Sequence, residues 1–230
     1  MIDSHLHGIE QVPEGYGDFS ELSRIVSCVA KPDEWDKQMQ IDDPRMIKCY
    51  GVHPWYGEEW TVESKSRLYN ILKDDPDAHV GEIGLDSKRG GKILFQTMVM
   101  IQQLDLAEYF GRVVSIHDVG CEKMVLDSLK GRKLKAILHS YGSDSYVKPY
   151  SEMECYFSVS PRLLSRSDIR VQRLMEAIPE DRLLLETDSP VCGKDFKGMR
   201  DFAERLGSII GKPADDLIAT AEENLRRLFP

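Results

Sequence analysis

The first seven residues, Met1-Ile2-Asp3-Ser4-His5-Leu6-His7, carry the pattern from which the fold can be worked out. In an extended strand alternate side chains point to one face, so Asp3, His5 and His7 would lie together. Two imidazoles and a carboxylate on one face are typical of a metal site. A divalent ion takes about four to six ligands, so the remaining ligands must come from elsewhere in the chain.

Beyond this segment, short apolar and β-branched runs alternate with amphipathic ones. Further strands are predicted at residues 25–30, 46–52, 78–82, 112–117, 134–139, 154–159 and 182–187. Helices are predicted at residues 33–40, 59–73, 93–110, 121–129, 167–178, 195–210 and 213–228. Eight strands separated by helices indicate a parallel sheet with right-handed crossovers, so we expect an α/β fold of the (β/α)8 TIM-type barrel. A doubly wound open sheet is the alternative.

Composition favours one ordinary globular domain. Hydrophobic residues make up 41% and charged residues 30% of the 230 residues, and no Pro/Gly/Ser-rich linker divides the chain, so residues 1–230 are expected to form a single domain. The formal net charge of −9 gives no overall basic footprint for nucleic acid. A phosphate-containing substrate would therefore need bound cations and a few local Arg or Lys side chains.

The five cysteines predict neither a disulfide framework nor a thiolate zinc site, because their number is odd and no Cys-x-x-Cys spacing occurs. We find no secretory leader pattern and no apolar run of membrane-spanning length. The expected location is therefore the reducing cytoplasm, with no membrane partner.

The residues able to bind a metal fall at the carboxyl ends of different predicted strands. This set consists of His5, His7, His53, Glu82, His117, His139 and Asp188. In a closed barrel these ends form one face, which is where barrel enzymes have their active sites. Five of the six histidines belong to the set, and His79, out of phase with Glu82, is expected at an edge or facing outward.

Four histidines and two carboxylates exceed the needs of one catalytic zinc, but they suit two metals that share a bridging carboxylate. Such a site activates water and neutralises charge on the leaving oxygen, so the predicted reaction class is hydrolysis. Mixed nitrogen and oxygen ligands leave Zn2+, Mn2+ and Mg2+ all possible. Catalysis by Ser140 or Ser189 is disfavoured, since neither lies in a Gly-x-Ser-x-Gly turn. Cys121 near His117 is likewise disfavoured as a nucleophile, because no sequence signature of a catalytic cysteine surrounds it.

Six motifs in order then resemble those of a known family. They are Asp3-Ser4-His5-Leu6-His7, Gly51-Val52-His53-Pro54, Gly81-Glu82-Ile83-Gly84-Leu85-Asp86, Ile116-His117, Leu138-His139-Ser140 and Leu184-Leu185-Glu186-Thr187-Asp188-Ser189-Pro190. Together they resemble the TatD-type metal-dependent deoxyribonucleases, a branch of the amidohydrolase-like barrels. The resemblance implies a phosphodiesterase that acts on DNA or a small phosphodiester.

The resemblance also implies roles for single residues. His5 and His7 would hold one metal, Glu82 would bridge two, and His117 and His139 would hold the second. Asp188 would bind the first ion and orient or deprotonate the attacking water. The candidate catalytic residues are accordingly Asp188, Glu82 and His53. Apart from the resemblance, Glu186 shares the inward face with Asp188, so Glu186, and Asp3 similarly, is expected either to orient a His ligand or to be an extra ligand.

The chain departs from the family pattern at two positions. Trp55 stands where the second motif usually continues to a further His, and its ring could stack on a base. Val119 stands where an Arg usually follows the strand-five His, so a phosphate contact is missing there. Arg89 matches a family position and could partly serve, so Arg89 and Trp55 are the candidate substrate-binding residues.

The interval between His7 and the second motif is short, so the first crossover helix is expected to be reduced to a loop, with residues 8–18 forming a polar loop on the active-site side. One flank of the barrel would then be less covered, which opens the site or exposes a surface for a protein partner. Two other functions remain open: hydrolysis of a cyclic amide, ester or lactone, and a barrel subunit that acts mainly within a complex.

Overall fold

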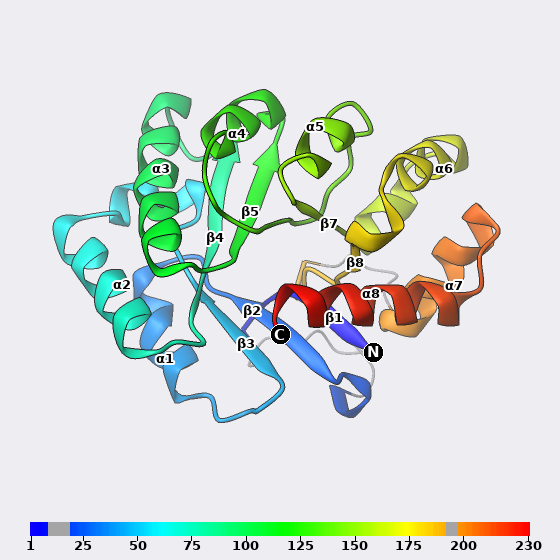
Figure 1. Ribbon diagram of the computed structural model, residues 1–230, viewed down its shortest axis with the longest axis horizontal. Helices are drawn as coiled ribbons and strands as arrows, with labels where there is room; N and C mark the ends of the chain where they lie inside the picture. The colour runs from blue at the N-terminus through cyan, green and yellow to red at the C-terminus, as the bar shows by residue number, and fades with distance from the viewer. Residues whose placement is uncertain (9–18, 192–196) are drawn as a thin grey trace.

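The eight strands form one parallel sheet in which sequence order is also spatial order (Figure 1). The computed structural model describes residues 1–8, 19–191 and 197–230. The strands are β1 Ile2–His7, β2 Arg24–Cys28, β3 Met46–Tyr50, β4 His79–Asp86, β5 Val114–Val119, β6 Ala136–Leu138, β7 Tyr156–Val159 and β8 Leu183–Leu185.

The segment after β8 returns to β1. The Asp188 amide donates to the His5 carbonyl at 3.0 Å, the His7 amide donates to the Ser189 carbonyl at 2.8 Å, and Leu6 and Ser189 form a parallel bridge. These bonds join the last strand to the first and close the sheet. The predicted TIM-type barrel is therefore confirmed, and the open-sheet alternative is wrong.

Helices follow the strands from β2 onward and cover the outside of the barrel (Figure 1). They are α1 Trp35–Gln40, α2 Val62–Asp74, α3 Ile93–Phe110, α4 Glu122–Leu129, α5 Val147–Ser151, α6 Asp168–Ala177, α7 Met199–Ile210 and α8 Ala214–Leu228. Large apolar side chains fill the space between sheet and helices, among them Trp35, Tyr50, Leu68, Met100 and Phe157. No helix in the described ranges is both long enough and apolar enough to cross a bilayer.

The connection between β1 and β2 differs from the later ones in its secondary structure. Within its described part, residues 19–23, the only regular element is the short 3-10 turn Phe19–Glu21. The loop predicted at residues 8–18 falls, from residue 9 onward, outside the described residues. The predicted start of a helix at residue 195 falls outside them as well, and α7 begins at Met199.

Several element boundaries differ from the sequence prediction for local physical reasons. The α2 helix begins at Val62 rather than near residue 59, because Thr61 and Ser64 form a reciprocal capping box, with a Thr61 amide to Ser64 Oγ distance of 2.8 Å. The five-residue helix α5 was not predicted, since a segment this short shows no helical periodicity.

The β4 strand continues four residues beyond its predicted end at residue 82 and pairs with β5 as far as Asp86 opposite Val119. Gly84 permits this pairing, since its φ is +145° and a Cβ there would lie 2.0 Å from the His117 carbonyl oxygen. Only glycine combines that conformation with so close an approach. Glu82 thereby lies within a long, buried strand.

Candidate metal centre

Glu82 lies at the centre of the carboxyl-terminal face, on β4, and its side chain is 1% exposed. One carboxylate oxygen, Oε2, faces β1: it lies 3.1 Å from His7 Nε2 and 3.6 Å from His5 Nε2. The two Nε2 atoms are 3.4 Å apart, as expected for alternate residues of one strand. Asp188 completes this first set, with Oδ1 at 3.7 Å from His7 Nε2.

The other carboxylate oxygen, Glu82 Oε1, faces a second set of imidazoles. It lies 2.8 Å from His117 Nδ1, 2.8 Å from His139 Nε2 and 3.3 Å from His53 Nε2. The His117 and His139 nitrogens are themselves 3.1 Å apart. Each oxygen of one carboxylate thus faces its own group of nitrogen donors.

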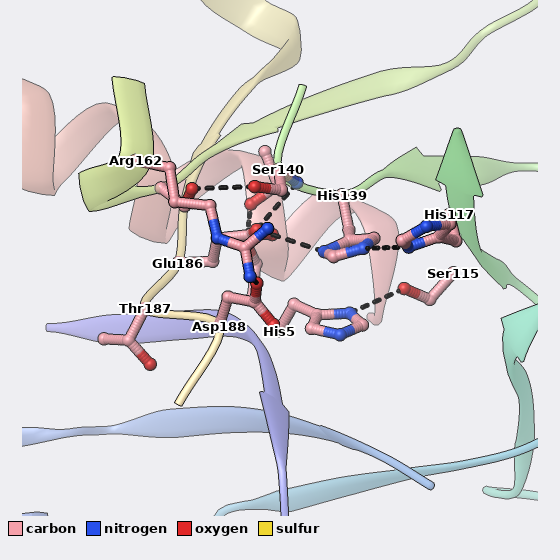
Figure 2. A network of polar contacts seen from close by, with 12 residues as sticks. His5, Ser115, His117, His139, Ser140, Arg162, Glu186, Thr187 and Asp188 are labelled. Carbon is pink, nitrogen blue, oxygen red and sulfur yellow. Dashed lines mark hydrogen bonds and ion pairs between the residues drawn. The ribbon is translucent and has the colours of Figure 1, made fainter. Parts of the chain in front are cut away.

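Two histidines have their ring orientation set by hydrogen bonds on the side away from Glu82. His5 Nδ1 lies 3.0 Å from Ser115 Oγ, and His139 Nδ1 lies 3.3 Å from Glu186 Oε1 (Figure 2). When Nδ1–H donates in these contacts, the Nε2 lone pair points into the site. Both rings are thereby prepared to bind a cation.

His53 differs from these rings in its backbone contact. Its Nδ1 accepts a hydrogen bond from the Trp55 amide at 3.1 Å, which leaves Nε2 to carry the proton of the neutral ring. That nitrogen lies 3.3 Å from Glu82 Oε1. His53 is therefore arranged to donate to the central carboxylate, whereas His5 and His139 present lone pairs to the site.

Charge controls the protonation of this cluster. Burial alone would raise the pKa of Glu82, but the surrounding imidazoles of His53 and His139 outweigh it and hold this pKa well below its usual range. Burial alone would lower the pKa of His139, but the Glu82 and Glu186 carboxylates hold it well above the usual value. For His53 burial prevails, and the pKa is lowered. The central carboxylate is thus an anion that favours cationic neighbours.

The donor set fits divalent metal ions. Three groups of side chains hold donor atoms within 4.8 Å of one another: His5, His139 and Asp188; His5, His7 and Glu82; His53, Glu82 and His117. Among the described residues the buried Nε2 of His117 has no hydrogen-bond partner, although it lies 3.5 Å from Asp86 Oδ2, and such an atom is unusual and can mark a functional site. Mixed imidazole and carboxylate donors suit several divalent metals and do not select one of them.

Asp3 and Asp188 are fixed by the junction between β1 and the segment after β8. Asp3 accepts from the Thr187 hydroxyl at 2.6 Å, from the Thr187 amide at 3.1 Å and from the His5 amide at 3.2 Å. Asp188 has a left-handed φ of +55°, which Asp adopts more readily than most residues. Asp3 therefore supports the backbone that presents His5 and Asp188.

Trp55, Arg89 and Asp86 form one wall of the site. The Arg89 guanidinium lies 3.8 Å above the Trp55 ring, and Trp55 Nε1 donates to Asp86 Oδ2 at 2.6 Å. Asp86 Oδ1 accepts from the Lys88 and Arg89 amides at 2.7 Å and 3.1 Å. Sequence reasoning singled out Trp55 and Arg89 but gave Asp86 no role. Its position at the end of β4 was the available signal.

Arg162 was also missed by the sequence reasoning. It follows β7, and its Nη2 lies 3.1 Å from Asp188 Oδ2 while half of its side chain remains exposed (Figure 2). The end of β7 bears no His or acidic residue, so the sequence there shows no metal-site pattern. The only available signal was an arginine immediately past a strand end.

A cavity of about 920 Å3 opens over the cluster, large enough for a nucleotide-sized ligand. All the predicted metal and substrate positions line it or lie directly beneath it: His5, His7, His53, Trp55, Glu82, Arg89, His117, His139 and Asp188. His79 lies at the opposite end of β4, where the Val113 amide donates to its Nδ1 at 3.2 Å. The structure thus separates the five clustered histidines from the sixth.

Comparisons with known proteins agree with this architecture. A family model described as TatD related DNase matches residues 2–230. The human protein named deoxyribonuclease TATDN3 is 24% identical over 263 residues, covering 100% of this chain and 94% of its own. The 3'-5' ssDNA/RNA exonuclease TatD of Klebsiella pneumoniae strain 342 is 30% identical over 197 residues, covering 78% of this chain and 75% of its own.

Solved structures show the same fold. YJJV, a TatD homologue from Escherichia coli K12, has a TM-score of 0.83 at 21% identity and covers 99% of this chain and 97% of its own. A phosphotriesterase homology protein from Escherichia coli, solved with phosphate in its active site, has a TM-score of 0.62 at 14% identity, covering 91% of this chain and 84% of its own. On the match across residues 2–230, this chain belongs to the TatD-related DNase family of metal-dependent hydrolases.

Proposed function

We propose that the protein is a phosphodiesterase of nuclease type that hydrolyses DNA or a small phosphodiester at a centre of two divalent metal ions. The observation that carries this proposal is that the two carboxylate oxygens of Glu82 face different sets of nitrogen atoms. Its Oε2 faces His5 and His7, and its Oε1 faces His117 and His139. A carboxylate placed between two nitrogen sets is suited to bridge two cations.

The ligands divide accordingly. His5, His7 and Asp188 would hold one ion, His117 and His139 the other, and Glu82 both. Bound in this way, divalent ions would polarise the phosphoryl oxygen, lower the pKa of an attacking water and neutralise the leaving oxygen. Zn2+, Mn2+ and Mg2+ are the candidates.

Asp188 is the proposed acceptor of the proton from the attacking water. Its carboxylate lies at the cavity, with Oδ1 toward His7 and Oδ2 held by Arg162. A general base must lie within reach of the group it deprotonates. Of the two carboxylates in the first metal set, Glu82 would bridge both ions, which leaves Asp188 to accept the proton. His53, by donating to Glu82 Oε1, would hold the central carboxylate in position.

Trp55 and Arg89 are the proposed contacts to a nucleotide. Trp55 is 38% exposed beside the cluster, and exposed aromatic rings can stack on any nucleic-acid base. The Arg89 guanidinium, stacked on this ring, is in position to meet a phosphate at the cavity mouth. The relatives' names, deoxyribonuclease and 3'-5' ssDNA/RNA exonuclease, support this substrate class.

The test is cleavage of defined single- and double-stranded DNA and of RNA by purified protein with Mg2+, Mn2+ or Zn2+. We expect metal-dependent cleavage that Glu82→Ala abolishes and that His79→Gln, at the other end of the same strand, retains. A parallel panel of bis-p-nitrophenyl phosphate, cyclic amides, esters and lactones identifies the bond. Turnover confined to the amides or lactones, or equal DNA cleavage by Glu82→Ala, would contradict the proposal.

A further inference from the structure

A second, smaller cavity of about 350 Å3 adjoins the metal cavity. The two cavities share four lining residues, which are His117, Val119, His139 and Arg162. The remaining wall of the smaller one comes from the loops after β5, β6 and β7. We call it the side cavity. A ligand bound over Glu82 could therefore extend directly into it, past Arg162.

Two arginines from one short segment face the side cavity. Arg162 lies within the 3-10 helix Pro161–Ser165, and Arg166 caps the end of that helix. Arg162 pairs with Asp188 across the boundary between the cavities. Arg166 donates to the Gly142 carbonyl oxygen, and no carboxylate of the described residues pairs with it. Both arginines are exposed: Arg162 lies beside Asp188 at the boundary, and Arg166 lines only the side cavity, so an anion in the side cavity could meet both guanidiniums.

Gly142 makes room for the Arg166 guanidinium. A Cβ at position 142 would lie 2.5 Å from Arg166 Nη2, which is closer than real contacts allow. Any other residue there would displace the end of the arginine side chain. Because the end of an arginine side chain is flexible, this shift would cost little, but it would move the guanidinium away from its place beside Gly142.

Hydroxyl groups complete the polar lining. Ser140 Oγ and Ser160 Oγ lie 2.8 Å apart, and the Ser140 amide donates to Glu186 Oε1 at 2.7 Å beside the His139 ring. Glu122 and Asp118 also line the side cavity, but Asp118 is occupied by hydrogen bonds from the Tyr150 hydroxyl at 3.0 Å and the Cys121 amide at 3.1 Å. Guanidinium and hydroxyl donors are the groups that bind phosphate oxygens.

We propose that the side cavity is a second phosphate subsite, in which Arg162 and Arg166 bind the phosphate next to the scissile one. The inference rests on the proposed function, since a neighbouring phosphate is present only when the substrate is a nucleotide chain. In a protein with a net charge of −9, local cations of this kind are needed to hold a polyanion. Substrates with a second phosphate would therefore be preferred.

The kinetic test uses substrates that differ by one phosphate. These are the 5'- and 3'-p-nitrophenyl phosphate esters of thymidine, each with and without a phosphate on the other hydroxyl, so that both chain directions are covered. The wild-type protein should show a higher kcat/KM for the bisphosphate form of at least one pair. Arg166→Ala should lower that preference about tenfold, the effect of losing one charge-assisted hydrogen bond.

Two further variants separate charge from position. Gly142→Ala keeps both arginines but displaces the Arg166 guanidinium, so the preference should fall in the same direction. Arg170→Ala removes an exposed arginine of α6 that lines neither cavity, and the preference should stay at the wild-type value. An undiminished preference in both Arg166→Ala and Gly142→Ala would overturn the subsite.

A binding measurement separates this inference from the proposed function. Calorimetric titration of Zn2+-loaded protein compares thymidine 3',5'-bisphosphate with the 5'- and 3'-monophosphates. We expect tighter binding of the bisphosphate by wild type and a smaller advantage in Arg166→Ala. This result would support the subsite even if no ester were hydrolysed. The absence of hydrolysis would contradict only the proposed function. Equal wild-type affinity for all three ligands would overturn the subsite even if DNA were cleaved.

Discussion

The two ends of the barrel place a half-buried histidine, His79, and a buried one, His139, in opposite electrostatic settings. At the amino-terminal end, His79 begins β4, accepts a hydrogen bond from the Val113 amide and packs with its ring centre 4.7 Å from that of Phe229. Burial, aided by the nearby Arg112 charge, lowers its pKa to about 4. At the carboxyl-terminal end, His139 is more deeply buried than His79, yet the Glu82 and Glu186 carboxylates raise its pKa well above the usual value.

The difference shows that burial alone does not make a histidine functional. At His79, partial burial and the Arg112 charge outweigh the attraction of the Asp75 carboxylate, so the ring stays neutral. With carboxylates on both sides a buried ring favours a positive charge, supplied by a proton or by a metal ion. The electrostatics of the carboxyl-terminal cluster are therefore compatible with a bound cation, whereas those at His79 favour a neutral, half-buried ring.

Replacing a histidine at each end of the barrel should have the largest and most unequal effects on turnover. His139→Ala removes a nitrogen donor from the second set and should lower phosphodiester turnover by about three orders of magnitude, the scale of losing a metal's stabilisation of developing charge. His79→Gln removes a ring that no part of the cluster contacts and should leave turnover near wild type. Steady-state rates on bis-p-nitrophenyl phosphate with saturating Mn2+ measure both. Comparable losses of turnover in the two variants would contradict the distinction between the carboxyl-terminal cluster and His79.

Asp188 allows proton transfer to be separated from metal binding. Asp188→Asn keeps an oxygen donor but cannot accept a proton, so turnover should fall by about 10²- to 10³-fold while metal content stays close to wild type. His5→Ala should lose metal as well as turnover. Rates and metal analysis on the same samples decide the matter. Near-full activity of Asp188→Asn would show that Asp188 is a metal ligand or a structural acid rather than the general base.

Glu186→Gln tests whether the carboxylate behind His139 raises the affinity of the site. The amide keeps the shape and an oxygen near His139 Nδ1 but removes the charge that raises the pKa of His139. Outer carboxylates of this kind typically contribute about 10- to 100-fold in metal affinity or activity. Calorimetric titration with Zn2+ should show a loss in that range. An unchanged affinity would reduce Glu186 to a partner of the Ser140 amide.

The smallest effect concerns stability at the amino-terminal end. The pKa of His79 in the folded protein, about 4, lies below the ordinary value of 6.5. The unfolded chain therefore binds the extra proton first, so this contribution is full above pH 6.5 and is lost as the pH falls toward 4. The loss amounts to at most about 3 kcal/mol. Urea unfolding of chelator-treated wild type and His79→Gln at pH 7 and pH 5 should show a steeper acid loss in wild type. Parallel losses would contradict the assignment.

The sequence predicted the barrel and the residues around Glu82 because both follow strand periodicity. His5 and His7 alternate on one strand, and His117 and Asp188 come at or just after strand ends, so closing the sheet brings them to one face. These are consequences of backbone geometry, which local pattern encodes.

The features that the sequence did not predict depend on side-chain direction and on short irregular elements. Arg162 lies in a 3-10 helix after a strand that ends without a His or acid, and only the folded chain shows its carboxylate partner. Asp86 accepts from the indole nitrogen of Trp55, a contact between the end of β4 and the 3-10 helix Pro54–Glu59. The division of the Glu82 oxygens between two imidazole sets is likewise a matter of rotamer, which no sequence pattern encodes.

The central claim is that Glu82 bridges two metal ions, and metal stoichiometry tests it most directly. Wild-type protein and Glu82→Ala would be dialysed against Zn2+ of increasing free concentration, and bound zinc would be measured per chain by elemental mass spectrometry. We predict two ions per wild-type chain and, in Glu82→Ala, weakened binding at both positions, because each loses a shared ligand. One ion in wild type, or two ions of unchanged affinity in Glu82→Ala, would contradict the claim.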